Sequence, residues 1–235
     1  MTKIKLMSFN TQHCLGYLAR KVDYDLMAKT IMEQGADIVG LNEMFDEGKG
    51  AKYGAQTKKL SDLTDLKNHY FAKAIDDSDG PYGNGILSRF KIKEVKTHII
   101  PDPNPRANPK GYYETRCVLV CDLENGLRVI VTHFGLEVDE QENAVKEVLK
   151  HIRDEKCVLM GDFNLEPSSP ILSPLFERLN DTSKGFCENT PSFPSDAPRI
   201  KIDYILSSKD MAVNFAQIPE VISSDHRPHI AIIEF

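Results

Sequence analysis

The sequence predicts a layered α/β protein, in which buried β-strands are interspersed with amphipathic helices. Short apolar runs bounded by polar residues recur along the chain, as at residues 157–160, and such runs are typical of buried strands. Residues 23–34 and 144–152 instead carry apolar side chains at helical spacing. The 235 residues show no repeat, low-complexity tract or long linker, so we expect a single domain over residues 1–235.

The first third of the chain predicts strand, helix and strand in that order. Residues 3–9 alternate as a strand and lead into Asn10. Residues 23–34 form the helix, with Asp23 or Asp25 as its cap and Gly35 as its stop. Residues 37–43 form a second buried strand that ends in Glu43. Asn10 could equally make an Asx-turn, and Glu43 could be a solvated rim carboxylate.

The middle of the chain predicts a short helix, three strands and a stiff loop. Leucines at 60, 63 and 66 indicate the helix, residues 69–74 a strand, and residues 76–83 a turn-rich loop. The strand at 85–88 is expected to continue as a hairpin through residues 92–100. Residues 101–111 contain four prolines and form a loop, which Tyr112 and Tyr113 either pack down or present to a substrate.

The remaining strands each end in or carry a polar residue. Asn125-Gly126 predicts a tight turn between strands at 115–123 and 127–132, and His133 follows the second. After the helix at 144–152 and the strand at 157–160, residues 170–179 predict another helix. Asp203 lies within an alternating strand at 200–206 and needs a partner, for which a histidine is suited. Residues 230–233 form the last strand.

Gly161-Asp162-Phe163-Asn164 is the most informative stretch. It follows a buried strand, and the i, i+2 spacing points Asp162 and Asn164 the same way, with Phe163 opposite and packed. A carboxylate beside a carboxamide can hold a hard cation, a phosphate oxygen and an attacking water together. A simple turn is the competing interpretation of these four residues.

Composition narrows the class of protein. No apolar run approaches the roughly 20 residues of a membrane span, and the first residues lack a signal-peptide pattern. Five scattered cysteines without metal-type pairs indicate free thiols, so we expect a cytoplasmic protein. A net charge of −6 argues against a strongly basic nucleic-acid binder. Lysines 49, 52, 58 and 59 are interpreted as solvated surface, with phosphate contact as the alternative.

Polar residues therefore gather at the ends of predicted strands, where α/β proteins form their sites. These residues are Asn10, Glu43, His133, Asp162, Asn164, Asp203, Asp225 and His226. An oxygen-rich set without a thiolate pair favours Mg²⁺ or Mn²⁺ over zinc.

The same residues lie in motifs that resemble the endonuclease/exonuclease/phosphatase (DNase I-like) superfamily. The motifs occur in the superfamily's order and cover nearly the whole chain: Ser8-Phe9-Asn10, Leu41-Asn42-Glu43, Gly83-Asn84-Gly85-Ile86-Leu87-Ser88-Arg89, Thr132-His133, Gly161-Asp162-Phe163-Asn164, Ile202-Asp203-Tyr204-Ile205 and Ser224-Asp225-His226. The resemblance implies a four-layer α-β-β-α sandwich, in which two packed mixed β-sheets are flanked by helices.

The resemblance also implies a role for each residue. Glu43 would be the main metal ligand, assisted by Asn10 and Asp225. Asp162 would orient or deprotonate the attacking water, while Asp203 would fix the tautomer of a catalytic histidine. The scissile phosphate would be contacted by Asn10, Asn164, His133, His226 and Arg116.

Three departures limit how far the resemblance specifies a branch. Gln12 stands where exonuclease III-like enzymes carry an acid. Thr132-His133 resembles the DNase and sphingomyelinase branches. The Cys-Asp-Arg signature of inositol phosphatases is replaced by Lys201-Ile202-Asp203.

We therefore expect a divalent-metal-dependent phosphoesterase, in particular a phosphodiesterase acting by in-line attack of water. Nucleic acid leads as substrate, followed by a small nucleotide, a phospholipid headgroup or a sugar phosphate. The alternative is a non-catalytic phosphate-binding module that keeps the fold. Loss of Asp162, Asn164 or His226 would have marked such a module, and all three are present. No protein partner is indicated.

Overall fold

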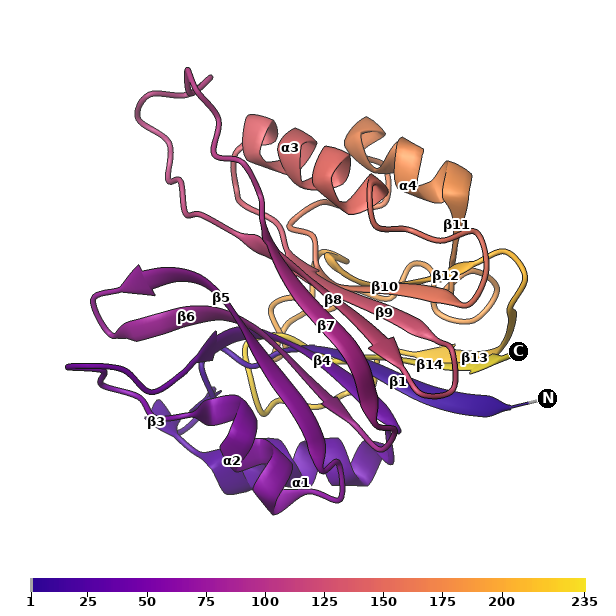
Figure 1. The fold of residues 1–235 in the computed structure, drawn as a ribbon, viewed down its shortest axis with the longest axis horizontal. Coiled ribbons are helices and arrows are strands. Elements are labelled where there is room, and N and C mark those ends of the chain that lie inside the picture. Colours follow the sequence, from indigo (N-terminus) through magenta and orange to yellow (C-terminus); the bar gives the residue numbers. More distant parts are fainter. Residues whose placement is uncertain (1) are drawn as a thin grey trace.

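Two six-stranded mixed β-sheets pack face to face at the centre of the protein (Figure 1). The structure, a computed structural model, describes residues 2–235. The first sheet consists, in spatial order, of β13 (Ala212–Gln217), β14 (His229–Glu234), β1 (Lys3–Asn10), β4 (Ile38–Phe45), β6 (Gly80–Ser88) and β5 (Asn68–Asp77). The second consists of β11 (Leu179–Asp181), β12 (Asp203–Ser208), β10 (Cys157–Asp162), β9 (Arg128–His133), β8 (Cys117–Leu123) and β7 (Ile92–Ile99). The short strands β2 (Leu15–Gly16) and β3 (Lys21–Val22) pair separately.

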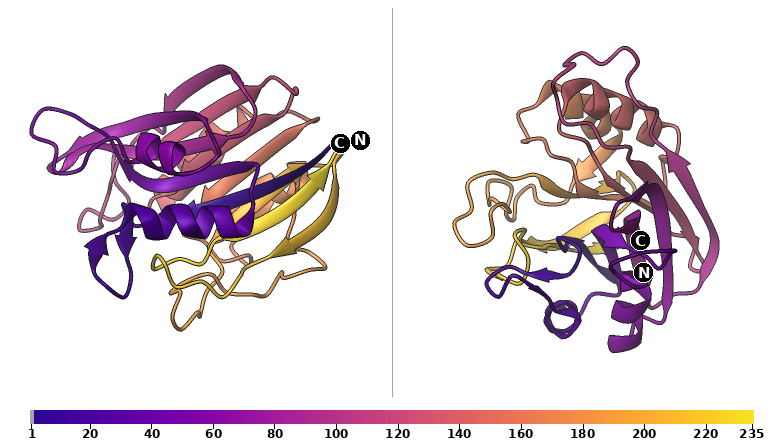
Figure 2. Two further views of the ribbon diagram at one scale, coloured as in Figure 1. Left: turned by 90° about the horizontal axis from the view of Figure 1, so that it is seen from below. Right: turned by 90° about the vertical axis from the view of Figure 1, so that its left-hand side faces the viewer.

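Helices cover the outer face of each sheet (Figures 1 and 2). Helices α1 (Tyr24–Gln34) and α2 (Gln56–Leu63) pack on the first sheet, and α3 (Val138–Leu149), the 3₁₀ turn η1 (Pro170–Leu172) and α4 (Ser173–Arg178) on the second. One apolar cluster fills the space between the sheets, and one lies beneath each set of helices. The predicted four-layer sandwich is confirmed.

Strand register brings the polar strand ends together. Strands β1 and β4 are parallel, with Asn10 opposite Asn42. Strands β9 and β10 are also parallel, with His133 opposite Asp162, and antiparallel β12 places Asp203 on the other side of Asp162. Because the carboxyl ends of the parallel strands in both sheets lie at the same end of the sandwich, their side chains can form one site.

The hairpin predicted from residues 85–88 into 92–100 is wrong. Strand β6 pairs with β4 and β5 in the first sheet, whereas β7 pairs with β8 in the second. The chain crosses between the sheets at Arg89 and Phe90. There the Arg89 guanidinium lies 2.7 Å from Asp37 Oδ1, and Phe90 packs against the core between the sheets. The turn therefore redirects the chain across the core instead of folding it back on β6.

Several predicted element boundaries also shift. Strand β4 continues past Glu43 to Phe45, and β6 already begins at Gly80, inside the region predicted as a loop. Edge strand β13 was missed because half of its residues are exposed and its pairing with β14 is irregular between Val213 and Phe215. Helix α1 agrees with prediction: the Asp23 carboxylate caps it, and Gly35 ends it in the left-handed conformation at φ 60°.

The cysteines are free thiols, as the sequence predicts: Cys14, Cys117, Cys121 and Cys157 are buried and Cys187 is half-buried. Burial raises the pKa of the first three to about 12, so these thiols pack as small apolar groups. No helix within residues 2–235 has the length and apolar character needed to cross a bilayer.

Gly161 lets β10 approach β9 closely before Asp162. Its φ is 148°, a value that L-residues rarely adopt, and an added Cβ would overlap the carbonyl oxygen of Thr132. We expect Gly161→Ala to lower the free energy of unfolding, measured in urea, by at least about 3 kcal/mol. In the control Gly126→Ala, φ is 87° and the new methyl meets nothing within 4 Å, so only backbone strain of about 1 kcal/mol is added. Equal losses in the two variants would contradict the predicted overlap.

Candidate active site

The Glu43 side chain is turned into the site by a β-bulge. The pairing of β4 with β6 shifts register between Leu41 and Met44, and Glu43 itself lies at φ 58°. A bulge inserts an unpaired residue and re-aims its side chain. Glu43 therefore faces the polar strand ends although it lies inside β4, where regular alternation would have placed it differently.

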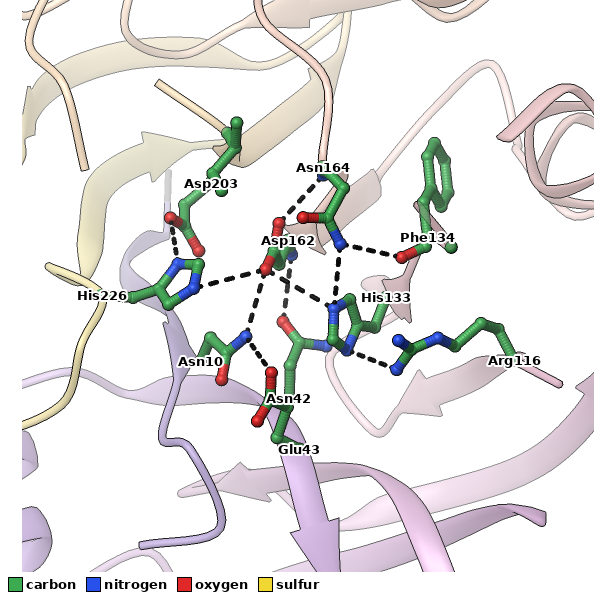
Figure 3. A network of polar contacts seen from close by, with 12 residues as sticks. Asn10, Asn42, Glu43, Arg116, His133, Phe134, Asp162, Asn164, Asp203 and His226 are labelled. Atoms are coloured by element: carbon green, nitrogen blue, oxygen red, sulfur yellow. Dashed lines mark hydrogen bonds and ion pairs between the residues drawn. The ribbon is translucent and has the colours of Figure 1, made fainter. Parts of the chain in front are cut away.

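Asp162 is the centre of the site (Figure 3). Its Oδ2 accepts a hydrogen bond from Asn10 Nδ2 at 3.1 Å, and the same amide donates to Glu43 Oε1 at 3.0 Å. Asp162 Oδ1 accepts from the backbone N–H of Asn164, which lies in the left-handed conformation at φ 50°. Burial raises the pKa of Asp162 to about 7, against the lowering effect of His226.

Phe163 anchors the turn between these two polar residues. Its ring is fully buried and stacks between Phe134 and Tyr204, at centroid distances of 4.6 and 4.8 Å. Asp162 and Asn164 point toward the site (Figure 3). Phe163 packs into the core beneath α3 and α4. The directions agree with the prediction, although β10 ends at Asp162 and the left-handed conformation of Asn164 replaces the strand geometry assumed there.

His226 lies between two carboxylates. Its Nδ1 is 2.9 Å from Asp203 Oδ2, and its Nε2 is 3.6 Å from Asp162 Oδ2. Burial would lower the pKa of His226, but the charges of Asp203 and Asp162 outweigh burial and raise it to about 10. The imidazolium form is therefore favoured near neutral pH, with Nδ1–H donating to Asp203 and Nε2–H directed at Asp162. The histidine partner that the sequence predicts for Asp203 is His226.

His133 is held in the opposite charge state. Burial, Arg116 and His226 lower its pKa well below the usual value. A nitrogen of the Arg116 guanidinium lies 2.9 Å from His133 Nδ1, and because a guanidinium can only donate, Nδ1 accepts. The proton of the neutral ring is then on Nε2, the nitrogen that faces Asp162 at 3.5 Å and the Asn164 amide at 3.2 Å.

Arg116 thus lies behind His133. Arg116 is 9% exposed, pairs with the Glu114 carboxylate at 2.7 Å and donates a hydrogen bond to the Tyr82 hydroxyl at 3.5 Å. In this arrangement its contacts fix the orientation of His133, which lies between Arg116 and the centre of the site (Figure 3).

A buried amide pair that the sequence analysis did not single out joins the two sheets beneath the site. Asn42 donates to Thr132 O at 2.9 Å and to Asn84 Oδ1 at 2.8 Å, and it accepts from the Asp162 N–H at 3.0 Å. Asn84 in turn donates to Cys117 O at 3.1 Å. Each amide follows or precedes apolar residues of a buried strand segment, Leu41 before Asn42 and Ile86 and Leu87 after Asn84, and this could have indicated a buried role.

Two of the metal ligands expected from the resemblance, Asn10 and Glu43, contact each other beside Asp162, and the third, Asp225, is close enough for its charge to act on Glu43. Burial, opposed by the Asn10 hydrogen bond and assisted by the Asp225 charge, raises the pKa of Glu43. Within residues 2–235 Glu43 forms no ion pair, and the Asp225 carboxylate accepts only from Ser224 Oγ at 3.0 Å. The charges of His226 and Arg116 reach Glu43 without forming an ion pair with it, so two carboxylates remain that fit a divalent cation preferring oxygen ligands. Asn10 currently presents its amide nitrogen to Glu43, because its Oδ1 accepts from the Gln12 N–H.

A cavity of about 340 Å³ opens beside Glu43. Aromatic rings form its wall: Phe45 lies 4.7 Å from Tyr53 and 5.0 Å from Tyr82, centroid to centroid, and His13 lies 5.4 Å from Tyr53. Lys52 lines the same cavity together with the carboxylates of Asp77, Asp79 and Glu114, and Lys52 pairs with Asp79 at 3.1 Å. The wall was not predicted because its rings come from three separate segments of the sequence.

The lysines between residues 49 and 59 and the proline-containing loop at residues 101–111, with the tyrosines that follow it, mainly make local contacts. Lys58 pairs with Asp62, and Lys59 lies over the Tyr24 ring, so only Lys52 of the four lysines lines this cavity. In the proline loop Tyr113 bonds Asp139 of α3, while Tyr112 is exposed. Tyr113 therefore packs the loop down and Tyr112 does not, whereas one of the two predicted alternatives has both tyrosines packed.

Comparison with known proteins finds one family model that matches, the endonuclease/exonuclease/phosphatase family, over residues 7–226. No curated protein matches the chain in sequence.

Three solved structures illustrate the fold. An endonuclease/exonuclease/phosphatase from Beutenbergia cavernae is 22% identical, with a TM-score of 0.84 over 100% of this chain and 72% of that chain. A mannosyl-6-phosphatase from Bacteroides thetaiotaomicron is 16% identical, with a TM-score of 0.75 over 99% and 100%. The catalytic domain of human Nocturnin, with bound sulfate, is 19% identical, with a TM-score of 0.72 over 99% and 93%. At these identities the likeness shows the fold.

Proposed function

The chain belongs to the endonuclease/exonuclease/phosphatase family, and on this premise we propose that it is a divalent-metal-dependent phosphodiesterase. The observation that carries the proposal is the buried His226 held between the Asp203 and Asp162 carboxylates. A carboxylate-held imidazolium that faces a second, basic carboxylate is suited to acid–base chemistry. Burying the charged His226 with the Asp203 and Asp162 carboxylates costs desolvation energy, and none of the contacts described above gives this arrangement a structural role.

Glu43, Asn10 and Asp225 would hold the metal ion, with Mg²⁺ or Mn²⁺ favoured by the oxygen-rich set. Asn10 would coordinate through Oδ1, which accepts one hydrogen bond from the Gln12 N–H and has a second lone pair. When bound, such an ion neutralises charge that builds on the phosphoryl and leaving oxygens.

The remaining residues would divide the work of hydrolysis. Asp162, with a pKa of about 7, can accept a proton from the attacking water. The Nε2–H groups of neutral His133 and cationic His226 can donate to phosphoryl oxygens, and His226 can also release its proton. The Asn164 amide, fixed by its bond to Phe134 O at 3.0 Å, would complete the set of phosphate donors.

The aromatic cavity supports a nucleotide or nucleic acid as substrate. A flat base can stack on the partly exposed Tyr53 ring, which lies against the buried Phe45, while the adjoining phosphate reaches the metal ion that Glu43 would hold. With one lysine at the cavity and a net charge of −6, a short or small substrate is favoured over a long duplex. A sugar phosphate is the second candidate, because a mannosyl-6-phosphatase shares the fold.

Hydrolysis of bis(p-nitrophenyl) phosphate tests the proposal. We expect turnover with Mg²⁺ or Mn²⁺ and none with EDTA. Glu43→Gln should raise the metal concentration needed for half-maximal rate by at least about tenfold, whereas Glu33→Gln, exposed on α1, should leave it unchanged.

The competing binding module makes a different prediction. It would bind metal and phosphate ligands but hydrolyse none of a panel of nucleic acids, nucleotides, sugar phosphates and phospholipids. Metal-independent turnover would contradict the proposed chemistry.

A further inference from the structure

A second group of possible metal ligands comes from other elements than the candidate active site. His98, near the end of β7, meets Glu147 in the last turn of α3 and His151 in the turn that follows the helix. One ligand atom from each of the three residues lies within 4.8 Å of the others. The His98 and His151 rings are 4.0 Å apart between centroids, and His151 Nε2 is 3.0 Å from Glu147 Oε1.

The three side chains are partly preorganised. Glu147 is 8% exposed, and the His151 side chain is 15% exposed. The turn after α3, closed by the bond from the His151 N–H to Val148 O at 2.9 Å, brings the His151 ring back to Glu147. The backbone carbonyl of His151 is fixed by a 3.1 Å hydrogen bond from Arg128. The ligand atoms therefore begin close to one another without being fully exposed.

The charge environment contains one favourable feature and several opposing cations. Burial lowers the pKa of His98, and the charges of Lys96 and Arg128 lower it further. The last carbonyls of α3 carry the negative end of the helix dipole, which favours a cation near Glu147 and His151. Opposing it, Lys150 Nζ pairs with Glu147 Oε2 at 2.6 Å. The Lys150 side chain is 61% exposed, so it can swing into water when another cation takes its place.

Ligand chemistry separates this cluster from the site around Glu43. Two imidazoles and one carboxylate suit Zn²⁺, whereas the oxygen ligands around Glu43 suit Mg²⁺. Tetrahedral zinc with bonds of about 2.0–2.2 Å requires ligand atoms roughly 3.3 Å apart, so the present spacing would have to close and the neighbouring His98 and His151 rings to turn until both lone pairs face one ion. A water molecule would fill the fourth position.

We propose that His98, Glu147 and His151 form a zinc site that clamps edge strand β7 to the carboxyl end of α3. Strand β7 has a partner on one side only, β8, where His98 lies opposite Val118. A zinc bridge would tie this edge to a helix from the layer above. Zinc would then stabilise the folded chain without entering the reaction.

Calorimetric titration with Zn²⁺ in saturating Mg²⁺ tests the proposal. Using a Glu43→Gln background suppresses zinc binding at the candidate active site. We expect one Zn²⁺ per chain, and His98→Gln should weaken its binding by more than about tenfold. Lys150→Gln should strengthen binding, because it frees the second oxygen of Glu147. His69→Gln, on exposed strand β5, is the matched control and should change nothing.

Thermal unfolding supplies a second measurement. Zn²⁺ should raise the Tm of the wild-type chain and not that of His98→Gln, since a ligand that binds only the folded state stabilises it. Without zinc the two proteins should melt alike and hydrolyse the same phosphodiester at the same rate. Equal zinc affinity in wild type and His98→Gln, or no zinc binding beyond that of the Glu43 site, would overturn the proposal.

Discussion

Replacing His226 by Ala is expected to lower kcat for a phosphodiester by about 10²–10⁴-fold, the usual contribution of a positioned general acid or base. The substitution removes the only side chain that contacts both Asp203 and Asp162 among the described residues. It also brings two buried carboxylates together without the cation between them. Steady-state kinetics with bis(p-nitrophenyl) phosphate would measure the effect, with exposed His69→Ala as the control.

Asp203→Asn removes the negative charge beside His226 and nearly keeps the shape of the side chain. Asp203 is the largest of the influences that raise the pKa of His226 to about 10. A group with a raised pKa is protonated below that value, so the wild-type imidazolium persists through neutral and mildly alkaline pH. Without the Asp203 charge the proton is lost at lower pH, and the alkaline limb of the kcat profile should move toward neutrality.

Two results would contradict this account of His226. One is a kcat for His226→Ala within a few-fold of wild type. The other is an alkaline limb that Asp203→Asn leaves in place while the rate falls, since that pattern would indicate a structural role for the pair.

Asn42→Leu is expected to lower the free energy of unfolding by at least about 3 kcal/mol. The change removes three hydrogen bonds and leaves the Asp162 N–H, the Thr132 carbonyl and the Asn84 amide oxygen buried without partners. Each such group costs about 1–3 kcal/mol. Urea denaturation would measure the loss.

The same substitution should also lower kcat, because Asn42 holds the backbone of Asp162. Asn143→Leu is the matched control: that amide donates to Pro101 O on the exposed side of α3 and should cost less than about 1 kcal/mol. A stable Asn42→Leu protein with full activity would show that the Asn42 amide does not position Asp162.

The sequence predicts those parts of the site that depend on local pattern. Asn10 ends an alternating segment and Asp162 closely follows an apolar run, so the order of residues alone places both at strand ends. A carboxylate in a packed strand is costly without a partner, so a histidine partner is predicted for Asp203, and His226 fills that place.

What the sequence could not predict depends on partners far along the chain. Glu43 enters the site through a bulge defined by pairing with β6, and residues 38–45 alone read as a regular strand. The crossing at Arg89 depends on Asp37, more than fifty positions earlier in the sequence. The contact of Arg116 with His133 arises from neighbouring strands whose side-chain directions only packing decides.

The pairing of β1 with β14 has a consequence for synthesis on the ribosome. These strands lie near opposite ends of the sequence, yet β14 fills the place between β1 and β13. Until β14 emerges, one edge of β1 remains unpaired, and exposed edges invite pairing with other chains. Contacts of such long sequence separation also slow folding. A nascent chain therefore carries an open sheet edge through most of its translation, and shielding by a chaperone would matter most in that interval.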